Sequence, residues 1–275
     1  MTCTRSSLAV RSPAYRRSVA NPQFLAFAHL LADAASRVIR PHFEKLGTVD
    51  TKADNSPVTI ADRDAETAMR GLIEQEFPDH AIFGEEQGHK KTISEFTWVI
   101  DPIDGTRAFI DGRKEWGTLI ALCSDGVPIL GVLDQPATGE RWAALAGQPA
   151  TLNNKPIAVR ATQKLSEAEV STTSALYFTP TQGEKMVALA KSCRRAVKDG
   201  DCYAYGLLAR GDRDLVVDAG LKPYDILALV PIIEAAGGVM TTWEGKPVTL
   251  TDSANVLAAG DKALHAAALA LLKSA

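Results

Sequence analysis

A strongly apolar segment that ends in two aspartates constrains the fold of this chain more than any other feature. The segment WVIDPIDGT runs from Trp98 to Thr106, and it places Asp101 and Asp104 directly after its apolar residues. A short apolar run of this kind is typical of a buried strand. Two charges at the end of a buried strand carry a large desolvation cost unless they have partners. The sequence therefore predicts a buried strand whose end binds a positive group.

The first part of the chain predicts two helices. Asn21 and Pro22 are typical of a helix start, and Pro41 predicts the end of that helix. Apolar residues recur between them at helical spacing, at Phe24, Phe27, Leu31, Ala35 and Val38. Residues 51–66 are polar and rich in turn formers, which predicts a loop or short hairpin before the second helix. That helix ends at Pro78, and its apolar face consists of Ala65, Met69, Leu72, Ile73 and Phe77.

Strands and turns follow the second helix. Residues 81–86 and 97–101 predict strands that end in acids, and Asp125-Gly126 and Asn153-Asn154 predict tight turns. After about residue 160, helices at about 181–193 and 203–210 alternate with strands near 168–173, 213–218 and 238–242. Residues 224–238 predict one amphipathic helix that is closed by Gly237-Gly238.

The composition excludes several classes of protein. The net charge of -3 argues against a generic nucleic-acid surface, and no apolar run reaches the length of about 18 residues that spans a membrane. The four cysteines have no CxxC spacing, which favours a reducing compartment, and we expect a cytoplasmic protein.

Three regions are expected along the chain. Residues 1–20 contain four arginines and no acid, a pattern of transit peptides or of a disordered tail, and we favour the tail. Residues 21–155 are predicted to form an N-terminal α+β lobe that carries the acidic motifs. Residues 156–275 are predicted to form a C-terminal α/β lobe.

Acids follow several predicted strands or precede helices, and we expect them to meet. They are Asp62 and Asp64, Glu85 and Glu86, Asp101 and Asp104, and Asp225. Carboxylates that are packed together repel one another unless a cation joins them. Oxygen ligands without His or Cys favour Mg²⁺, and none of the five histidines has a zinc-site spacing. Simpler interpretations remain for single acids, because Asp225 could cap a helix, Glu86 could be a solvated surface charge and Asp62 could be a first-turn acid.

Gly105 and Thr106 suggest the chemistry at this strand end. A glycine lets the backbone approach a ligand closely, and the N–H groups at a helix start bind anions, phosphate above all. Metal ions beside a phosphate-binding turn favour metal-assisted hydrolysis of a phosphate ester, in which Thr106 could hold the attacking water.

Four motifs together resemble the inositol-monophosphatase-like family of Mg²⁺-dependent phosphatases. They are SPVTIADRDAE at 56–66, GEE at 84–86, DPIDGT at 101–106 and YDILALVPIIEAAGG at 224–238, and they occur in the order and spacing of the family over roughly residues 22 to 273. The spacing DxxDGT differs from the DxDGT of haloacid-dehalogenase phosphatases, so we expect no phospho-aspartate. The resemblance implies a layered αβαβα sandwich of the sugar-phosphatase type, and commonly a homodimer.

The resemblance also implies a set of metal ligands for two or three Mg²⁺ ions. Glu85, Asp101 and the carbonyl of Ile103 would hold one ion. Asp101, Asp104 and Asp225 would hold a second, and Glu85 would face a weaker third site.

The catalytic roles follow from the same resemblance. Glu85 and Thr106 would orient a water activated by the metal, with Asp62 hydrogen-bonded nearby. Gly105 and Thr106 would bind the phosphate through backbone N–H groups. No nucleic acid or membrane partner is implied.

Residues 104–122 and 215–240 resemble the bacterial histidinol-phosphatase branch more than inositol monophosphatase. We therefore expect hydrolysis of L-histidinol phosphate to L-histidinol and phosphate in histidine biosynthesis. The acids Asp218, Asp111 or Glu115 could contact the cationic amine. Trp116 could stack on the imidazole or be a core aromatic, and Arg107 is a further candidate contact. The alternatives are inositol-1-monophosphatase, a related sugar or nucleotide phosphatase, and a regulatory binding protein without turnover.

Overall fold

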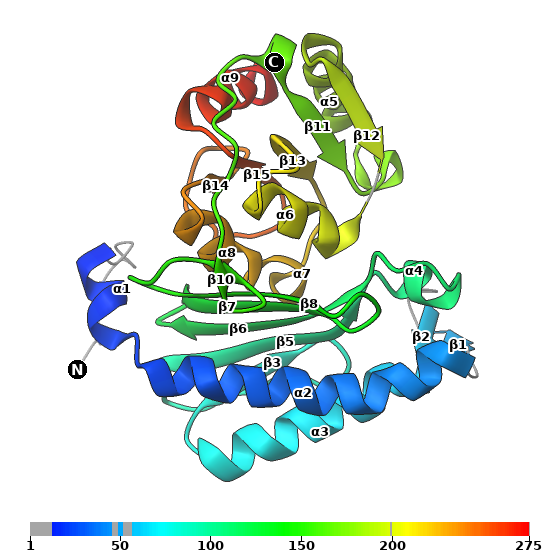
Figure 1. The fold of residues 1–275 in the computed structure, drawn as a ribbon, viewed down its shortest axis with the longest axis vertical. Coiled ribbons are helices and arrows are strands. Elements are labelled where there is room, and N and C mark those ends of the chain that lie inside the picture. Colours follow the sequence, from blue (N-terminus) through cyan, green and yellow to red (C-terminus); the bar gives the residue numbers. More distant parts are fainter. Residues whose placement is uncertain (1–12, 46–48, 52–56, 199, 275) are drawn as a thin grey trace, which may run out of the picture.

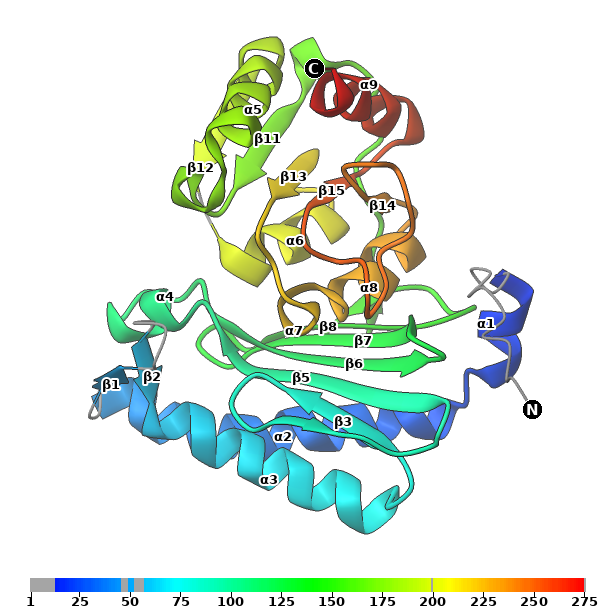
Figure 2. The same cartoon turned by 180° about the vertical axis from the view of Figure 1, so that it is seen from behind.

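Helices and sheets alternate in five layers in the computed structural model, which describes residues 13–45, 49–51, 57–198 and 200–274. Opposite views show the order of the layers (Figures 1 and 2). One outer layer is formed by α2 (Pro22–Lys45) and α3 (Ile60–Glu76), the middle layer by α6 (Asp201–Ala209), α7 (Pro223–Ile226) and α8 (Leu229–Ala235), and the other outer layer by α5 (Pro180–Ser192) and α9 (Lys262–Lys273). The expected αβαβα sandwich is confirmed.

The larger sheet lies between α2 and α3 on one face and α6 to α8 on the other. Within the described residues it has eight strands, in the order β10-β9-β8-β7-β6-β5-β3-β4. The strands are β3 (Ala81–Gly84), β4 (Gly88–Lys90), β5 (Phe96–Asp104), β6 (Gly117–Ser124), β7 (Val127–Gln135), β8 (Glu140–Leu145), β9 (Thr151–Leu152) and β10 (Lys155–Pro156). Only β3 and β5 pair in parallel among these described strands, so the two acidic strand ends lie at the same edge.

The smaller sheet separates the middle helices from α5 and α9. Its described strands are β12 (Arg195–Lys198), β11 (Glu169–Thr172), β13 (Leu215–Asp218), β15 (Val256–Ala259) and β14 (Val239–Thr242), in that spatial order. Short 3₁₀ helices at Leu165–Glu167 (η1) and Ala175–Tyr177 (η2) flank β11. A separate hairpin of β1 (Val49–Thr51) and β2 (Pro57–Thr59) precedes α3, which agrees with the expected entry to that helix.

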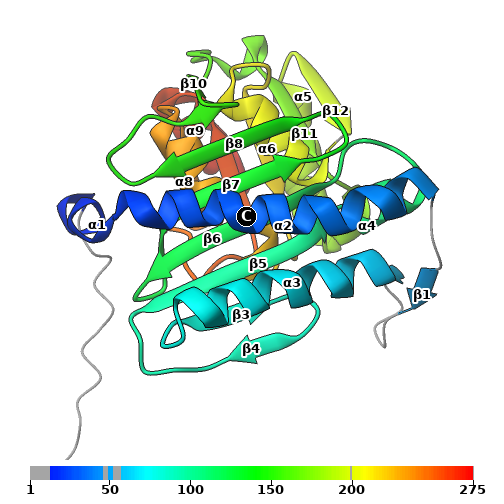
Figure 3. The same ribbon diagram turned by 60° about the horizontal axis from the view of Figure 1, so that its bottom comes forward.

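The central strand β5 is buried on both faces, as its apolar sequence predicts. Trp98 and Ile100 pack toward α2 and α3, whereas Val99 packs toward the middle helices. Figure 3 shows α2 and α3 lying across one face of the larger sheet. The hairpin predicted at Asp125-Gly126 is also confirmed, because both residues have positive φ angles of 47° and 77° and join β6 to β7.

Two predicted helix boundaries were wrong, and each lies near a proline. Helix α2 continues through Pro41 to Lys45, because Pro41 is exposed and water can bond the carbonyl that the proline leaves unpaired. The helix predicted over 224–238 is divided into α7 and α8, because Pro231 has no N–H to donate to the carbonyl of Leu227. Its end is as expected, since Gly237 has a φ of 96°.

Part of the segment 1–20, which was expected to be a disordered tail, forms a helix. Residues Pro13–Val19 form α1, so a disordered tail is the wrong description for them, whereas residues 1–12 lie outside the described residues. The Tyr15 hydroxyl donates to Glu95 at 2.8 Å, and Arg16 pairs with Glu234 at 2.7 Å. The division into lobes at residue 155 stays a prediction. None of the described helices is long and apolar enough to cross a membrane.

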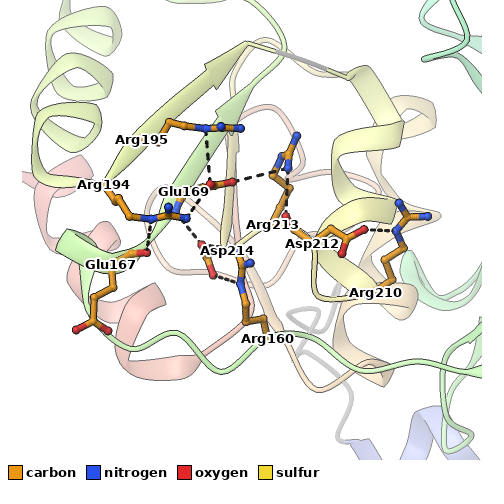
Figure 4. Close-up of polar contacts among 9 residues, drawn as sticks. All are labelled: Arg160, Glu167, Glu169, Arg194, Arg195, Arg210, Asp212, Arg213 and Asp214. Atoms are coloured by element: carbon orange, nitrogen blue, oxygen red, sulfur yellow. Dashed lines mark hydrogen bonds and ion pairs between the residues drawn. The ribbon is translucent and has the colours of Figure 1, made fainter.

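An arginine-rich network closes one end of the smaller sheet (Figure 4). The guanidinium of Arg160 donates two hydrogen bonds of 2.7 Å to Asp214, which is buried just before β13. Glu169, at the start of β11, accepts a hydrogen bond of 2.7 Å from Arg194. Because Arg160 lies in the segment between the two sheets, this network fixes that connection to the start of the smaller sheet.

Candidate active site

The chain turns sharply where β5 ends. The pairing with β6 shifts between Asp101 and Asp104, so the strand end is irregular. The buried Asp101 accepts the N–H of Ile103 at 3.1 Å. Gly105 follows with a φ of 82°, a left-handed conformation that favours glycine, and α4 (Thr106–Ile110) begins directly after it. This turn holds the two aspartates side by side at the edge of the sheet.

Three aspartates meet at this edge. Carboxylate oxygens of Asp101, Asp104 and Asp225 lie within 4.8 Å of one another. Asp104 accepts the N–H of Cys202 at 2.7 Å, and Asp225 accepts the N–H of Lys222 at 2.7 Å, so backbone contacts orient both side chains. Asp225 therefore also caps the start of α7, as its simpler interpretation proposed, while its carboxylate faces the other two acids.

A second group of acids comes from α3 and from the turn after β3. Carboxylate oxygens of Asp62, Glu85 and Glu86 lie within 4.8 Å of one another. Asp62 is fully buried, and the Glu86 side chain is only 5% exposed, so the interpretation of Glu86 as a solvated surface charge was wrong. Asp64 is exposed and lies outside both groups. The sequence placed Glu86 among the converging acids but gave it no role in the site, because two adjacent acids in a turn usually point to solvent.

The two groups interact electrostatically. The pKa of Asp101 is raised well above its ordinary value, first by burial and then by the nearby Glu85, Asp104, Asp225 and Asp62. Burial also raises the pKa of Asp225 to about 7. So many carboxylates cannot all ionise at this spacing without a cation. The donor set consists of oxygen atoms alone, which suits a hard cation such as Mg²⁺ better than Zn²⁺ or Cu²⁺.

The turn at Gly105 leaves little room. A β-carbon there would lie 3.1 Å from a carboxylate oxygen of Asp201 and 3.0 Å from the carbonyl of Glu115, so only glycine fits without a shift. The Thr106 hydroxyl donates to the carbonyl of Ile103 at 3.1 Å. The metal contact of that carbonyl and the phosphate-binding roles of Gly105 and Thr106 stay predictions.

Two of the expected substrate contacts were wrong. Asp218 is only 3% exposed and accepts hydrogen bonds from Thr172, Thr173 and Tyr205, so its oxygens are occupied within the protein. Trp116 is fully buried in the core, which confirms its interpretation as a core aromatic. Arg107 is exposed on α4, and its contact with substrate stays a prediction.

Sequence reasoning missed a carboxylate beside the site. Asp201 begins α6 with an unusual positive φ of 38°, directly after Gly200. Its pKa is raised to about 6, first by burial and then by Asp218, while Arg113 acts in the opposite direction. The only sequence signal is the Gly-Asp pair before an apolar helix, which does not reveal that α6 starts next to Asp104.

Comparison with known proteins identifies the family of this chain. Residues 20–275 match the model of the inositol monophosphatase family. The chain belongs to that family. It is a phosphoric monoester hydrolase, and members of the inositol monophosphatase family are generally Mg²⁺-dependent, which agrees with the acidic groups.

Individual members of the inositol monophosphatase family differ in their named substrates. The bifunctional phosphatase IMPL2 of Arabidopsis thaliana, described as chloroplastic, is 45% identical over 98% of this chain and 80% of its own length. The histidinol-phosphatase of Chlorobaculum parvum is 37% identical over 78% of this chain and 84% of its own length. The structure of an inositol monophosphatase from Zymomonas mobilis is 45% identical, with a TM-score of 0.84, and covers 96% of this chain and 100% of its own.

Proposed function

We propose that the chain hydrolyses L-histidinol phosphate to L-histidinol and phosphate, as a step of histidine biosynthesis. The similarity to a histidinol-phosphatase over most of both chains supports this substrate. Within the site, the observation that carries the proposal is Asp201, a carboxylate outside the two acidic groups that could hold the metal. It lies against the Gly105 turn, where the phosphate is expected to bind.

A carboxylate in this position suits a cationic leaving group. Histidinol phosphate carries an ammonium group, which Asp201 would bind by a charge-assisted hydrogen bond. Tyr177 is a further candidate contact, with an aromatic side chain that is 56% exposed. Burial and then the charge of Asp201 raise the pKa of its hydroxyl, whereas Arg107 acts in the opposite direction. A neutral inositol ring offers neither an ammonium group for Asp201 nor an aromatic partner for Tyr177.

The acidic groups are proposed to hold two or three Mg²⁺ ions. Asp101, Asp104 and Asp225 would bind one ion, and Glu85 would share Asp101 and the Ile103 carbonyl around another. When bound, these ions would neutralise phosphate charge and make a water molecule more acidic. The Thr106 hydroxyl and Glu85 would orient that water, and Asp62 would accept a proton in the same network.

Hydrolysis of inositol monophosphate is the second candidate. It is favoured by the likeness to the Zymomonas mobilis inositol monophosphatase over the whole of that chain. A regulatory protein without turnover is not favoured, because a binding module has no need for two buried acidic groups.

A panel of esters with Mg²⁺ distinguishes these candidates. We expect the highest kcat/KM on histidinol phosphate, compared with inositol monophosphate, fructose bisphosphate, 3′-phosphoadenosine phosphate and p-nitrophenyl phosphate. Asp201→Asn should lower kcat/KM on histidinol phosphate about ten- to a hundred-fold, since a charge-assisted hydrogen bond contributes about 1.5–3 kcal/mol.

The matched control is Asp212→Asn, which removes an exposed acid paired with Arg210. It should leave kcat/KM on histidinol phosphate and on p-nitrophenyl phosphate within about threefold of the wild-type values. Equal losses on histidinol phosphate and p-nitrophenyl phosphate in Asp201→Asn would reject the recognition of an amine.

Light scattering would test the proposed homodimer, and fractionation of cells would test the proposed cytoplasmic location.

A further inference from the structure

A fully buried carboxylate on α3 contacts the turn that carries Glu85. Glu66 has no exposed surface, and it accepts the backbone N–H of Glu86 at 2.7 Å and that of Gln87 at 3.0 Å. Two of the three turn residues after β3 are thus bonded to a side chain from the neighbouring helix, while the N–H of Glu85 donates to the carbonyl of Ile100 on β5. Both hydrogen bonds end on one side chain, so this contact fixes two successive backbone N–H groups relative to α3.

Arg70 pairs with this carboxylate in the interior. Its guanidinium donates to Glu66 at 2.7 Å, one helical turn away, and it also donates to the carbonyl of Gly88 at the far end of the turn. A charged carboxylate buried without such a partner would carry a large desolvation cost. Glu66 and Arg70 therefore bind both sides of the same turn.

The backbone is shaped to admit the Glu66 side chain. A β-carbon at Gly84 would overlap the Glu66 carboxylate, so any other residue there would displace it. Gly84 immediately precedes Glu85. The close approach of Glu66 thus depends on a glycine in the GEE segment, for a reason unrelated to phosphate binding.

The position of Glu66 on α3 links this contact to the acidic groups. Asp62 lies one helical turn before Glu66 on the same face, and Asp62 itself lies with Glu85 and Glu86. Helix α3 thus presents one carboxylate to the acidic group and uses the next to hold the turn that supplies the rest of that group. Any movement of the turn would change the distance between Asp62 and Glu85.

We propose that Glu66 is a positioning residue for metal binding: it holds the turn after β3 so that Glu85 and Glu86 face Asp62. The proposal rests on the proposed role of Glu85 as a metal ligand. A residue that supports a ligand in this way affects metal affinity more than it affects the chemistry of the loaded enzyme, and losses of about ten- to a hundred-fold are typical.

The test is Glu66→Gln, which keeps the shape of the side chain but turns an amide N–H toward a backbone N–H. We expect Mg²⁺ affinity, measured by calorimetry without substrate, to weaken about tenfold. The Mg²⁺ concentration for half-maximal hydrolysis of p-nitrophenyl phosphate should rise equally, while kcat at saturating Mg²⁺ stays within about threefold. Gly84→Ala should give the same pattern by displacing Glu66. It replaces Glu66→Gln as the test variant if Glu66→Gln folds poorly.

Thr67→Val is the matched control. It removes the hydrogen bond of 2.8 Å from the Gln87 side chain but leaves both backbone contacts of Glu66 intact, so Mg²⁺ affinity should stay near that of the wild type. Unchanged Mg²⁺ affinity in folded Glu66→Gln and Gly84→Ala would overturn the positioning role. Glu85→Gln tests the ligand role of Glu85 separately from the positioning role of Glu66. Unchanged Mg²⁺ affinity in Glu85→Gln would reject Glu85 as a ligand.

Discussion

The buried hydroxyl of Tyr205 donates a hydrogen bond of 2.9 Å to Asp218. The other oxygen of Asp218 accepts the N–H of Thr173 at 2.8 Å and the hydroxyl of Thr172 at 3.1 Å. Tyr205 belongs to α6, the threonines end or follow β11, and Asp218 ends β13. One carboxylate thus connects three elements that surround the acidic site, and both of its oxygens are already hydrogen-bonded within the protein.

Asp218→Asn should therefore impair every substrate alike. An amide cannot accept all of these hydrogen bonds, so we expect a loss of about 1–3 kcal/mol in the free energy of unfolding. For a chain of this length, that corresponds to a fall of about 2–4 °C in Tm for each kcal/mol. Calorimetry would measure the Tm, and kinetics on histidinol phosphate and p-nitrophenyl phosphate should show equal losses. A loss confined to histidinol phosphate would restore Asp218 as a recognition residue.

Asp101→Asn should nearly abolish turnover. Its carboxylate belongs to one acidic group and is influenced by Glu85 and Asp62 of the other, so its removal takes away a charge that is proposed to face two ions. We expect kcat to fall at least about a hundredfold at saturating Mg²⁺, and the rise in Tm on adding Mg²⁺ to disappear. Asp64→Asn is the control, since Asp64 is exposed and lies outside the acidic groups. Activity in excess EDTA equal to that with Mg²⁺ would contradict the metal mechanism.

The metal-free protein should become less stable as the pH rises from about 5 to 8. The pKa values of Asp201 and Asp225 are raised to about 6 and about 7, above the value near 3.9 of an unfolded aspartate. The folded state therefore binds more protons than the unfolded state between these values, and its advantage is lost as the pH rises through them. Mg²⁺ binds the ionised carboxylates, so the increase in Tm on adding Mg²⁺ should be larger at pH 8 than at pH 5. An increase independent of pH would contradict this linkage.

Asp214→Asn should reduce stability without affecting the chemistry. The change removes one of the two hydrogen bonds from Arg160, and we expect a loss of about 1–3 kcal/mol. Hydrogen bonds from Arg160 and the Glu169 N–H outweigh burial and lower the pKa of Asp214, so this contribution is present above pH 4 and is lost as the pH falls further. Asp212→Asn is the control, since Asp212 pairs with Arg210 at the exposed edge of the same network (Figure 4). A fall in kcat at saturating Mg²⁺ would mean that the network also shapes the site.

Local sequence predicted those parts of the fold that depend on neighbouring residues. The turn at Asp125-Gly126 and the buried strand around Trp98 follow from short patterns, and the structure agrees with both. Strand β12 gave no such signal, because residues 195–198 are mostly exposed and are strand residues only through pairing with β11.

The same limit applies to the candidate site, because local sequence does not show which distant residues pack together. The acids after β3 and β5 could be expected to meet, since strand ends of one sheet share an edge. Asp201 could not be placed in this way, because its position depends on the packing of α6 against a strand from the other half of the chain. The roles of Trp116 and Asp218 were misjudged for a related reason: residue type indicates possible chemistry, but only packing shows whether a side chain reaches solvent.

The order of the acids along the chain has a consequence for synthesis on the ribosome. Asp62, Glu85 and Asp101 emerge early, whereas Asp225 follows only after most of the smaller sheet has been made. Until then the early carboxylates have only part of their shared cation site, and their mutual repulsion opposes compaction of the first sheet. Mg²⁺ should therefore bind late in synthesis. The ion would stabilise a nearly complete chain and would not nucleate its folding.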